Sequence, residues 1–200
     1  RLLLPAGAAG KKLVVYGLGI ADNSEFEQSF ENAEVHGFDC TVTSNSPAVF
    51  GKRFVFHEVC IGSPPNLSEM ASTTYGKRAK RSAPHFTFKT LPEVMLGLNH
   101  TKVDILKFDI EGAEWELITQ NILPLPWSML PAQLLFELHG AGANPKAVSP
   151  SLTNGKTRRQ VNKLFLGLHD RGYRILSSSR NRGDHSCSEF SLVLVENETF

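Results

Sequence analysis

The chain has 200 residues and is 41% hydrophobic, which is enough to bury the core of one ordinary globular domain. Its 21 Lys and Arg residues balance its 20 Asp and Glu residues, so net charge points to neither nucleic acid nor an anionic membrane as a partner. No apolar run approaches the roughly 18 to 20 residues that span a bilayer. Because the chain opens without Met, we expect residues 1–200 to be a single domain excised from a longer chain.

The three cysteines are Cys40, Cys60 and Cys187. Their wide spacing, without C-x-x-C or paired Cys and His, indicates neither a disulfide framework nor a structural zinc site, so we expect no metal site. The three N-glycosylation sequons begin at Asn66, Asn99 and Asn197. They would permit a secretory route without establishing one, which leaves the compartment open.

In chain order, the first elements are a strand and a helix. "KLVVYGLG" (12–19) is a β-branched run that ends in glycines, which is typical of a buried strand entering a tight turn. Residues 21–30 predict a helix, because Ser24 and Glu27 have the spacing of a capping box.

The next segments are less regular. Apolar runs over residues 33–42 and 52–62 predict the second and third strands. Residues 63–89 show no period, and loops of this length are usually functional or disordered, so we expect a long flexible insertion that forms a flap near the site. Residues 90–98 predict a short helix with its own capping box.

The second half continues the alternation. "VDILKFDIEGAEWELI" (103–118) predicts a fourth strand that turns into a helix at Glu111 and Gly112. A fifth strand, an amphipathic helix and a terminal strand pair are expected over residues 132–140, 157–172, 173–178 and 189–196. Alternation of this kind is typical of a parallel α/β sheet with helices on both faces. The terminal pair, which we expect to be antiparallel, distinguishes it from a plain dinucleotide-binding fold.

Glycines and an acidic residue follow the first two strands. Ligands of open α/β sheets bind beyond the carboxyl ends of the strands, and Gly17 and Gly19 would let the backbone approach one there, although a plain tight turn explains them equally. Asp22 stands where a G-x-G-x-x-G motif needs glycine, which disfavours a nicotinamide cofactor. Asp39 has the spacing of an acceptor for ribose hydroxyls.

The fourth strand carries an unusual density of charge. Lys107, Asp109 and Glu111 alternate and so share one face, where burial of three ionisable groups would be costly. We therefore expect the strand to end there, in a wet cleft. Glu111 and Glu114 would also suit the first turn of the following helix, whose dipole favours acidic groups, but Lys107 and Asp109 need the cleft.

Two further pairs follow neighbouring strands. Cys60 and Ile61 could flank an adenine ring, although core packing explains them about as well. Glu137 and His139 share one face of the fifth strand. A cleft role and a structural role for His139 are equally open.

Three stretches resemble the FkbM-like S-adenosylmethionine-dependent methyltransferases, and within them the methyltransferase-like protein 24 group. They are "VVYGLGIADNSEFE", "VDILKFDIEGAEWELI" and "QLLFELHG", within a likeness that runs from about Leu13 to His139. The resemblance implies a class I methyltransferase fold. Its Rossmann-like sheet is mostly parallel, with seven strands, the last antiparallel, and helices on both faces.

The resemblance also implies S-adenosylmethionine as the cofactor. Gly17 and Gly19 would line its methionine moiety and Asp39 would accept its ribose hydroxyls. Asn23 or Ser24 would contact the amino-acid end, because "YGLG" stands where many class I enzymes have an acidic residue that opens a three-glycine turn. The residues expected to contact the cofactor are Tyr16, Gly17, Leu18, Gly19, Ser24, Asp39, Cys60, Ile61 and Asp109.

We expect O-methylation of a small-molecule or glycan hydroxyl. A hydroxyl acceptor must lose its proton, and Asp109, His139 and then Glu111 are the candidate bases. Lys107, Glu137 and His139 are expected to contact the acceptor. The alternative is a non-catalytic domain that keeps the fold, and with it the cofactor site, as an interaction module.

Nucleic-acid binding rests on "KRAKR" (77–81) alone. No aromatic residues are interleaved with these charges, so a solvated basic loop is the preferred interpretation and a processing site stays open. We expect neither a nucleic-acid partner nor membrane contact.

Overall fold

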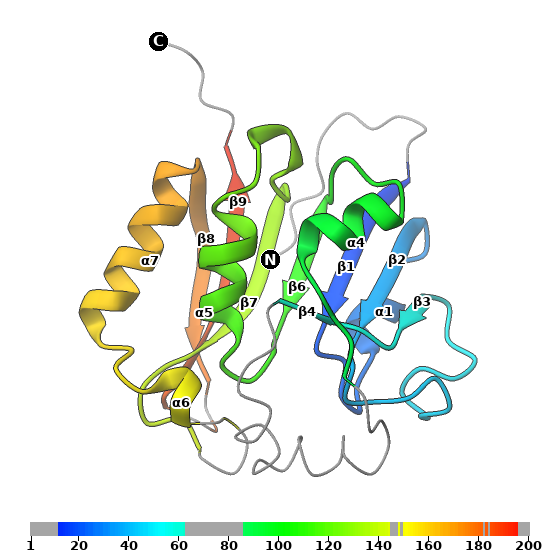
Figure 1. The fold of residues 1–200 in the computed structure, drawn as a ribbon, viewed down its shortest axis with the longest axis horizontal. Coiled ribbons are helices and arrows are strands. Elements are labelled where there is room, and N and C mark those ends of the chain that lie inside the picture. The colour runs from blue at the N-terminus through cyan, green and yellow to red at the C-terminus, as the bar shows by residue number, and fades with distance from the viewer. Residues whose placement is uncertain are drawn as a thin grey trace.

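The computed structural model describes residues 12–62, 86–144, 148, 150–181, 183 and 185–195. At its centre is a seven-stranded sheet with the order β3-β2-β1-β6-β7-β9-β8 (Figure 1). Neighbouring strands from β3 to β7 run parallel, whereas β9 is antiparallel to both β7 and β8. The expected mostly parallel sheet with an antiparallel last strand is confirmed.

The strands of the sheet are β1 (Leu13–Leu18), β2 (Ala33–Phe38), β3 (Val55–His57), β6 (Ile105–Phe108), β7 (Gln133–His139), β8 (Tyr173–Arg180) and β9 (Cys187–Leu194). The helices are α1 (Glu25–Gln28), α4 (Leu91–Gly97), α5 (Glu114–Glu116), α6 (Pro150–Thr153) and α7 (Arg158–Asp170). A π-helical segment (Leu117–Ile122) continues α5, and a 3₁₀ turn (Trp127–Met129) follows it. Among the described residues, no helix is long and apolar enough to cross a membrane.

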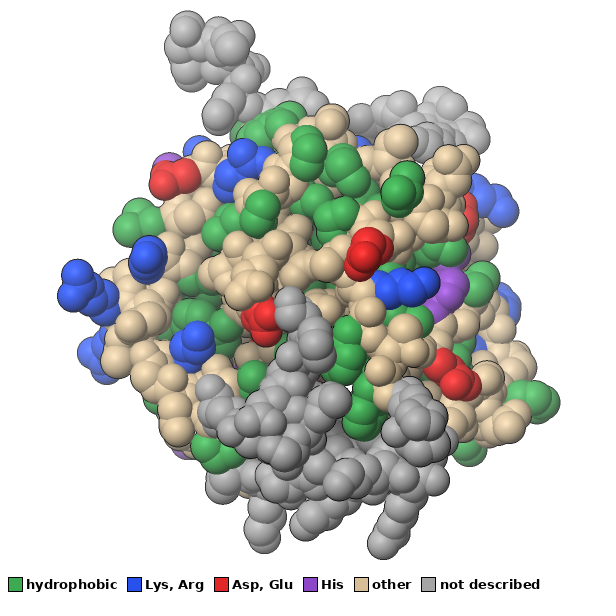
Figure 2. Space-filling view, viewed as in Figure 1, with side chains coloured by type: hydrophobic (Ala, Val, Ile, Leu, Met, Phe, Trp, Pro, Cys, Tyr) green, Lys and Arg blue, Asp and Glu red, His purple; other side chains and the backbone are tan. Residues whose placement is uncertain are grey.

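Two hydrophobic clusters cover the two faces of the sheet. The larger packs α4, α5 and α7 against β1, β6 and β7, and the smaller packs Phe26 of α1 and the segment before β3 against the opposite face. Neighbouring residues of β1 divide between them, since Val15 belongs to the smaller cluster and Tyr16 to the larger. Burial on both sides explains the nearly continuous apolar strands. Figure 2 shows the face formed by α4, α5 and α7, with exposed hydrophobic side chains between scattered charges.

The expected third strand, residues 52–62, is two strands. Val55–His57 joins the main sheet, whereas Cys60–Ile61 (β4) pairs with Phe88–Lys89 (β5) in a separate two-stranded sheet. The end of the segment expected to be aperiodic is therefore β5. The rest of that segment, residues 63–85 with the KRAKR stretch, lies outside the described residues, so the flap stays a prediction.

Of the two capping boxes predicted from the sequence, one is present in the structure and the other is not. The box of Thr90 and Glu93 is confirmed at the start of α4. The box of Ser24 and Glu27 is wrong, because Ser24 donates its hydroxyl to the carbonyl of Ala48 and Glu27 is buried against β1. The helix α1 spans only Glu25–Gln28 and not residues 21–30, and it has no side-chain cap.

Candidate active site

A cavity of about 520 Å³ opens at the carboxyl ends of β1, β2 and β6. The strand order reverses there, because the chain runs outward from β1 to β2 and β3 on one side and from β6 to β7 on the other. Its volume suits a small molecule. The lining includes Leu18, Gly19, Ile20, Ala21, Phe26, Phe38, Asp39, Cys60, Ile61, Lys107, Asp109 and Glu111.

Gly19 joins the three strand ends at the cavity. Its N–H donates to the carbonyl of Phe38 at 3.0 Å, and the N–H of Asp109 donates to the carbonyl of Leu18 at 3.2 Å. Its φ of 78° lies in the left-handed region, and a β-carbon on residue 19 would collide with the carbonyl oxygen of Asp109. Only glycine therefore allows β1 to turn this close to the end of β6.

Gly17 packs against α1 in the structure, and a cofactor contact by this residue stays a prediction. It is absent from the described lining of the cavity, and a β-carbon on it would collide with the carboxylate of Glu27. Glu27 is buried, and its Oε1 has no hydrogen-bond partner within the described part of the chain. Burial raises the pKa of Glu27, against the lowering effect of the nearby Lys107 charge. The geometry explains Gly17 by the packing of α1.

Tyr16 and Ser24 are also absent from the lining of the cavity among the described residues. The Tyr16 side chain is fully buried on the α4 side of the sheet and bonds His100. Ser24 is buried and bonds Ala48 and Gln28. A cofactor contact by either residue therefore stays a prediction.

Asp39 directly follows β2, and both of its carboxylate oxygens accept hydrogen bonds. Oδ2 accepts the N–H of Ala21 at 2.8 Å, and Oδ1 accepts the N–H and the hydroxyl of Thr41 at 2.7 and 2.6 Å. Asp39 is 5% exposed and lines the cavity. A carboxylate has about four acceptor positions, so Oδ2 keeps one for a ligand hydroxyl.

The expectation of no disulfide is wrong, because Cys40 and Cys60 are bonded. The bond joins the residue after Asp39 to β4, and so fixes the wall that Cys60 and Ile61 form beside the end of β2. Their separation of 20 residues gave no motif by which to expect it. Cys187 is buried in β9 and lies outside this bond.

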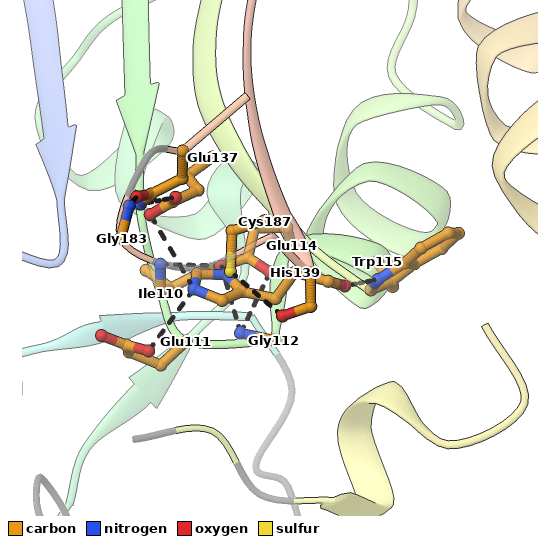
Figure 3. Close-up of polar contacts among 11 residues, drawn as sticks. Ile110, Glu111, Gly112, Glu114, Trp115, Glu137, His139, Gly183 and Cys187 are labelled. Carbon is orange, nitrogen blue, oxygen red and sulfur yellow. Dashed lines mark hydrogen bonds and ion pairs between the residues drawn. The ribbon is translucent and has the colours of Figure 1, made fainter. Parts of the chain in front are cut away.

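The turn after β6 is built around Glu114. Glu111 and Gly112 have φ values of 56° and 102°, so they form a left-handed turn and not the expected start of the helix. Glu114 is fully buried, and its carboxylate accepts the N–H groups of Ile110 at 2.9 Å and of Gly112 at 3.0 Å (Figure 3). It therefore satisfies backbone donors that the turn would otherwise leave unpaired.

His139 is held from two sides by α5. Its Nδ1 lies 3.1 Å from Oε1 of Glu114, and its carbonyl accepts the indole N–H of Trp115 at 2.7 Å (Figure 3). Its Nε2 faces Oε2 of Glu111 at 3.5 Å and Oε2 of Glu137 at 3.9 Å. His139 and Glu137 are absent from the described lining of the cavity and lie behind Glu111.

Burial and nearby charges shift the pKa values of His139, Asp109 and Glu111. Burial alone would lower the pKa of His139, but the hydrogen bond to Glu114 and the charges of Glu114, Glu111 and Asp109 raise it to about 9. Burial raises the pKa of Asp109 to about 6 despite the nearby Lys107 charge. Burial likewise raises the pKa of Glu111 to about 7, against the effect of His139. The cavity thus holds two carboxyl groups that titrate near neutral pH, backed by an imidazolium.

These groups could also hold a cation by distance alone. Ligand atoms of Asp109, Glu111 and His139 lie within 4.8 Å of one another. The carboxylates here already have Lys107 and His139 as counter-charges. A zinc-type ligand would have to be a neutral imidazole, which the raised pKa of His139 disfavours.

Sequence reasoning missed the part played by Glu114 and assigned it to the helix dipole. The available signal was the Glu111-Gly112 pair, because a turn at that point exposes N–H groups that need an acceptor. The nearest downstream acidic side chain is Glu114. No such signal existed for Glu27, because the expected capping box with Ser24 already explained an acidic residue at that position.

Comparisons with known proteins identify the family of this chain. A family model described as "Methyltransferase domain" matches residues 7–194. Probable methyltransferase-like protein 24 of Homo sapiens is 30% identical over 132 residues, covering 64% of this chain and 33% of that protein. The same protein of Rattus norvegicus is 31% identical over 133 residues, with the same coverage. The chain therefore matches about a third of the length of these curated relatives.

Among solved structures, the fibrillarin pre-rRNA processing protein of Methanococcus jannaschii is similar to this chain with a TM-score of 0.48 and 11% identity. The match covers 92% of this chain and 66% of that one. The family assignment rests on the sequence match, which spans nearly the whole chain. The chain belongs to the FkbM-type family of S-adenosylmethionine-dependent methyltransferase domains.

Proposed function

We propose that this chain binds S-adenosylmethionine in the cavity at the ends of β1, β2 and β6 and methylates a hydroxyl group of a small molecule or glycan. The observation that carries the proposal is that the Gly19 turn and the Asp109 and Glu111 carboxyl groups meet in one cavity. A cofactor site and a proton acceptor are thereby adjacent.

The residues present suit this cofactor. Asp39 keeps an acceptor position for a ribose hydroxyl, and Phe38 and Ile61 offer apolar surface to a purine ring. The turn at Gly19 brings main chain, without a side chain, to the remaining wall. When bound, S-adenosylmethionine supplies an electrophilic methyl group on a sulfonium.

The protein has two tasks beyond holding the cofactor. It must place the acceptor oxygen in line with the methyl group, and it must remove the hydroxyl proton. Asp109, with a pKa of about 6, is ionised at neutral pH and can accept that proton. Glu111, with a pKa of about 7, can bond a second hydroxyl of the acceptor in either protonation state. His139 stays protonated and balances the carboxylates, so it serves as a positioning residue and not as the base.

Two successive assays, one for cofactor binding and one for methyl transfer, test the proposal. Calorimetry of the purified chain should show saturable binding of S-adenosylmethionine. Incubation with methyl-labelled cofactor and a panel of hydroxyl-bearing metabolites and glycans should then yield labelled product and S-adenosylhomocysteine. Binding without transfer to any member of the panel would favour the non-catalytic interaction module, and absence of binding would overturn both ideas.

A further inference from the structure

A second group of titratable side chains lies on the α4 side of the sheet, where core packing would favour apolar residues. We call it the histidine cluster. It consists of Tyr16 on β1, Glu34 and His36 on β2, His57 on β3 and His100 after α4. None of these five residues is in the described lining of the cavity. The Phe38 ring lies between the cavity and the cluster, and its centroid is 4.6 Å from that of the His57 ring.

Two imidazoles converge on one carboxylate oxygen. Oε1 of Glu34 lies 3.1 Å from Nε2 of His36 and 3.0 Å from Nε2 of His100. All three atoms lie within 4.8 Å of one another. The three residues come from β2 and from the end of α4, so the fold brings together ligand atoms that are 66 residues apart in the chain.

The remaining ring nitrogens are also engaged. Nδ1 of His36 lies 2.9 Å from Nε2 of His57, and Nδ1 of His100 lies 2.7 Å from the hydroxyl of Tyr16. In metal sites, the second nitrogen of a ligating histidine almost always has such a partner, which fixes the orientation of the ring. In this cluster the hydroxyl of Tyr16 and the ring of His57 hold the second nitrogens of His100 and His36.

The protons of the cluster are compatible with a cation. A ligating imidazole must be neutral and must carry no hydrogen on the nitrogen that holds the ion. Each Nε2 that now donates to Glu34 can give up its hydrogen if the ring changes tautomer. The hydrogen on Nδ1 of His100 then donates to the hydroxyl oxygen of Tyr16. The hydrogen on Nδ1 of His36 donates to Nε2 of His57, whose own hydrogen moves to its Nδ1. Binding thus keeps both outer hydrogen bonds.

We propose that Glu34, His36 and His100 form a site for a divalent transition-metal ion of the zinc class. Two imidazoles and one carboxylate are a ligand set that zinc accepts, with a fourth position left for solvent. His36 and His100 are buried or nearly so, while the side chain of Glu34 is 49% exposed and gives the ion a route from water. The cysteine spacing carried no information on this site, because its ligands are not cysteines. The proposal is independent of methyl transfer.

The test is metal binding by the whole chain after it has been stripped with a chelator. Zn²⁺ is titrated in competition with a chromophoric chelator, and Co²⁺ is titrated while its visible absorption is followed. The wild-type chain should bind one equivalent at this site, and Zn²⁺ should raise its melting temperature. Glu34→Gln, a change at a half-exposed position, should weaken Zn²⁺ binding at least about 10-fold and reduce the melting shift. Tyr16→Phe should weaken it by roughly 10- to 100-fold through the orientation of His100.

Two histidine controls locate the ion. His169→Gln changes an exposed histidine on α7, and His139→Gln changes the histidine beside Glu111. Both variants should bind Zn²⁺ as the wild type does. Circular dichroism without metal checks that each variant is folded. Failure of the wild type to bind, binding that survives both Glu34→Gln and His100→Gln, or binding that is lost only in His139→Gln would each overturn the proposal.

Discussion

Gly19 and Asp109 lie so close that a β-carbon on the glycine would collide with the carbonyl oxygen of the aspartate. This contact connects the turn after β1 with the end of β6. Because both residues line the same cavity, the backbone that would approach the cofactor and the carboxylate that would face the acceptor are positioned by one another.

Gly19→Ala should therefore reduce cofactor binding. Alanine at a φ of 78° is strained, and its methyl group would push the end of β1 away from Asp109. We expect at least about a 10-fold loss of S-adenosylmethionine affinity by calorimetry, equivalent to 1.4 kcal/mol or more. Gly97→Ala is the matched control, because a β-carbon there meets no atom within 4 Å. Equal affinities in a folded Gly19→Ala chain would refute the role of this turn.

Gly17→Ala should destabilise the fold. The new β-carbon would collide with the carboxylate of Glu27, and overpacking of this kind typically costs about 1–3 kcal/mol. Glu27→Ala in the same chain should restore part of the free energy of unfolding, measured by urea denaturation. The double variant should also still bind cofactor. If it is stable but binds none, Gly17 contacts the cofactor after all.

Asp39→Asn should weaken cofactor binding by about 1–3 kcal/mol, the scale of hydrogen bonds to a charged group. The matched control is Asp104→Asn, since Asp104 also accepts a backbone N–H, that of Val14, but at the opposite end of β1. Calorimetry should show lower affinity for Asp39→Asn alone. Lost activity with unchanged cofactor affinity would contradict ribose recognition by Asp39.

His139 should make stability depend on pH. Its folded pKa of about 9 lies above the unfolded value of 6.5, so its contribution is fully present below pH 6.5 and is lost as pH rises through 9. His139→Gln should lower the free energy of unfolding by on the order of 3 kcal/mol at pH 6, and by much less at pH 10. His169→Gln, at an exposed position, should show no such trend. A wild-type advantage over His139→Gln that is constant between pH 6 and 10 would show that His139 is not held as a cation.

The sheet could be predicted from sequence because its strands are buried on both faces and its helices carry periodic apolar residues. The amphipathic pattern of residues 157–172 became α7, which ends just before Gly172 as expected. The same reasoning failed at residues 52–62, where two very short strands belong to different sheets. Apolar content alone does not show where a strand changes its partner.

The candidate site was predictable in its positions but less so in its contacts. Strand parity predicted that Lys107, Asp109 and Glu111 share a cleft. All three line the cavity, although β6 ends at Phe108 and Glu111 lies in the left-handed turn after it. Parity gives no information on packing across elements, so the contacts of Glu114 with His139 and of Glu27 with Gly17 were missed. The Cys40–Cys60 bond was missed for the same reason, because a long-range pairing leaves no local pattern.

The most direct test of the account is the pH dependence of kcat/KM for the wild type and for Asp109→Asn, once an acceptor has been identified. Glu111→Gln serves as the control for the neighbouring carboxyl group. If Asp109 takes the acceptor proton, wild-type kcat/KM should fall as pH drops below about 6, where this carboxyl becomes protonated. Asp109→Asn should stay folded, lose on the order of 10²-fold or more in rate, and lose that acidic limb. A folded Asp109→Asn enzyme with the kcat/KM and pH profile of the wild type would contradict the account.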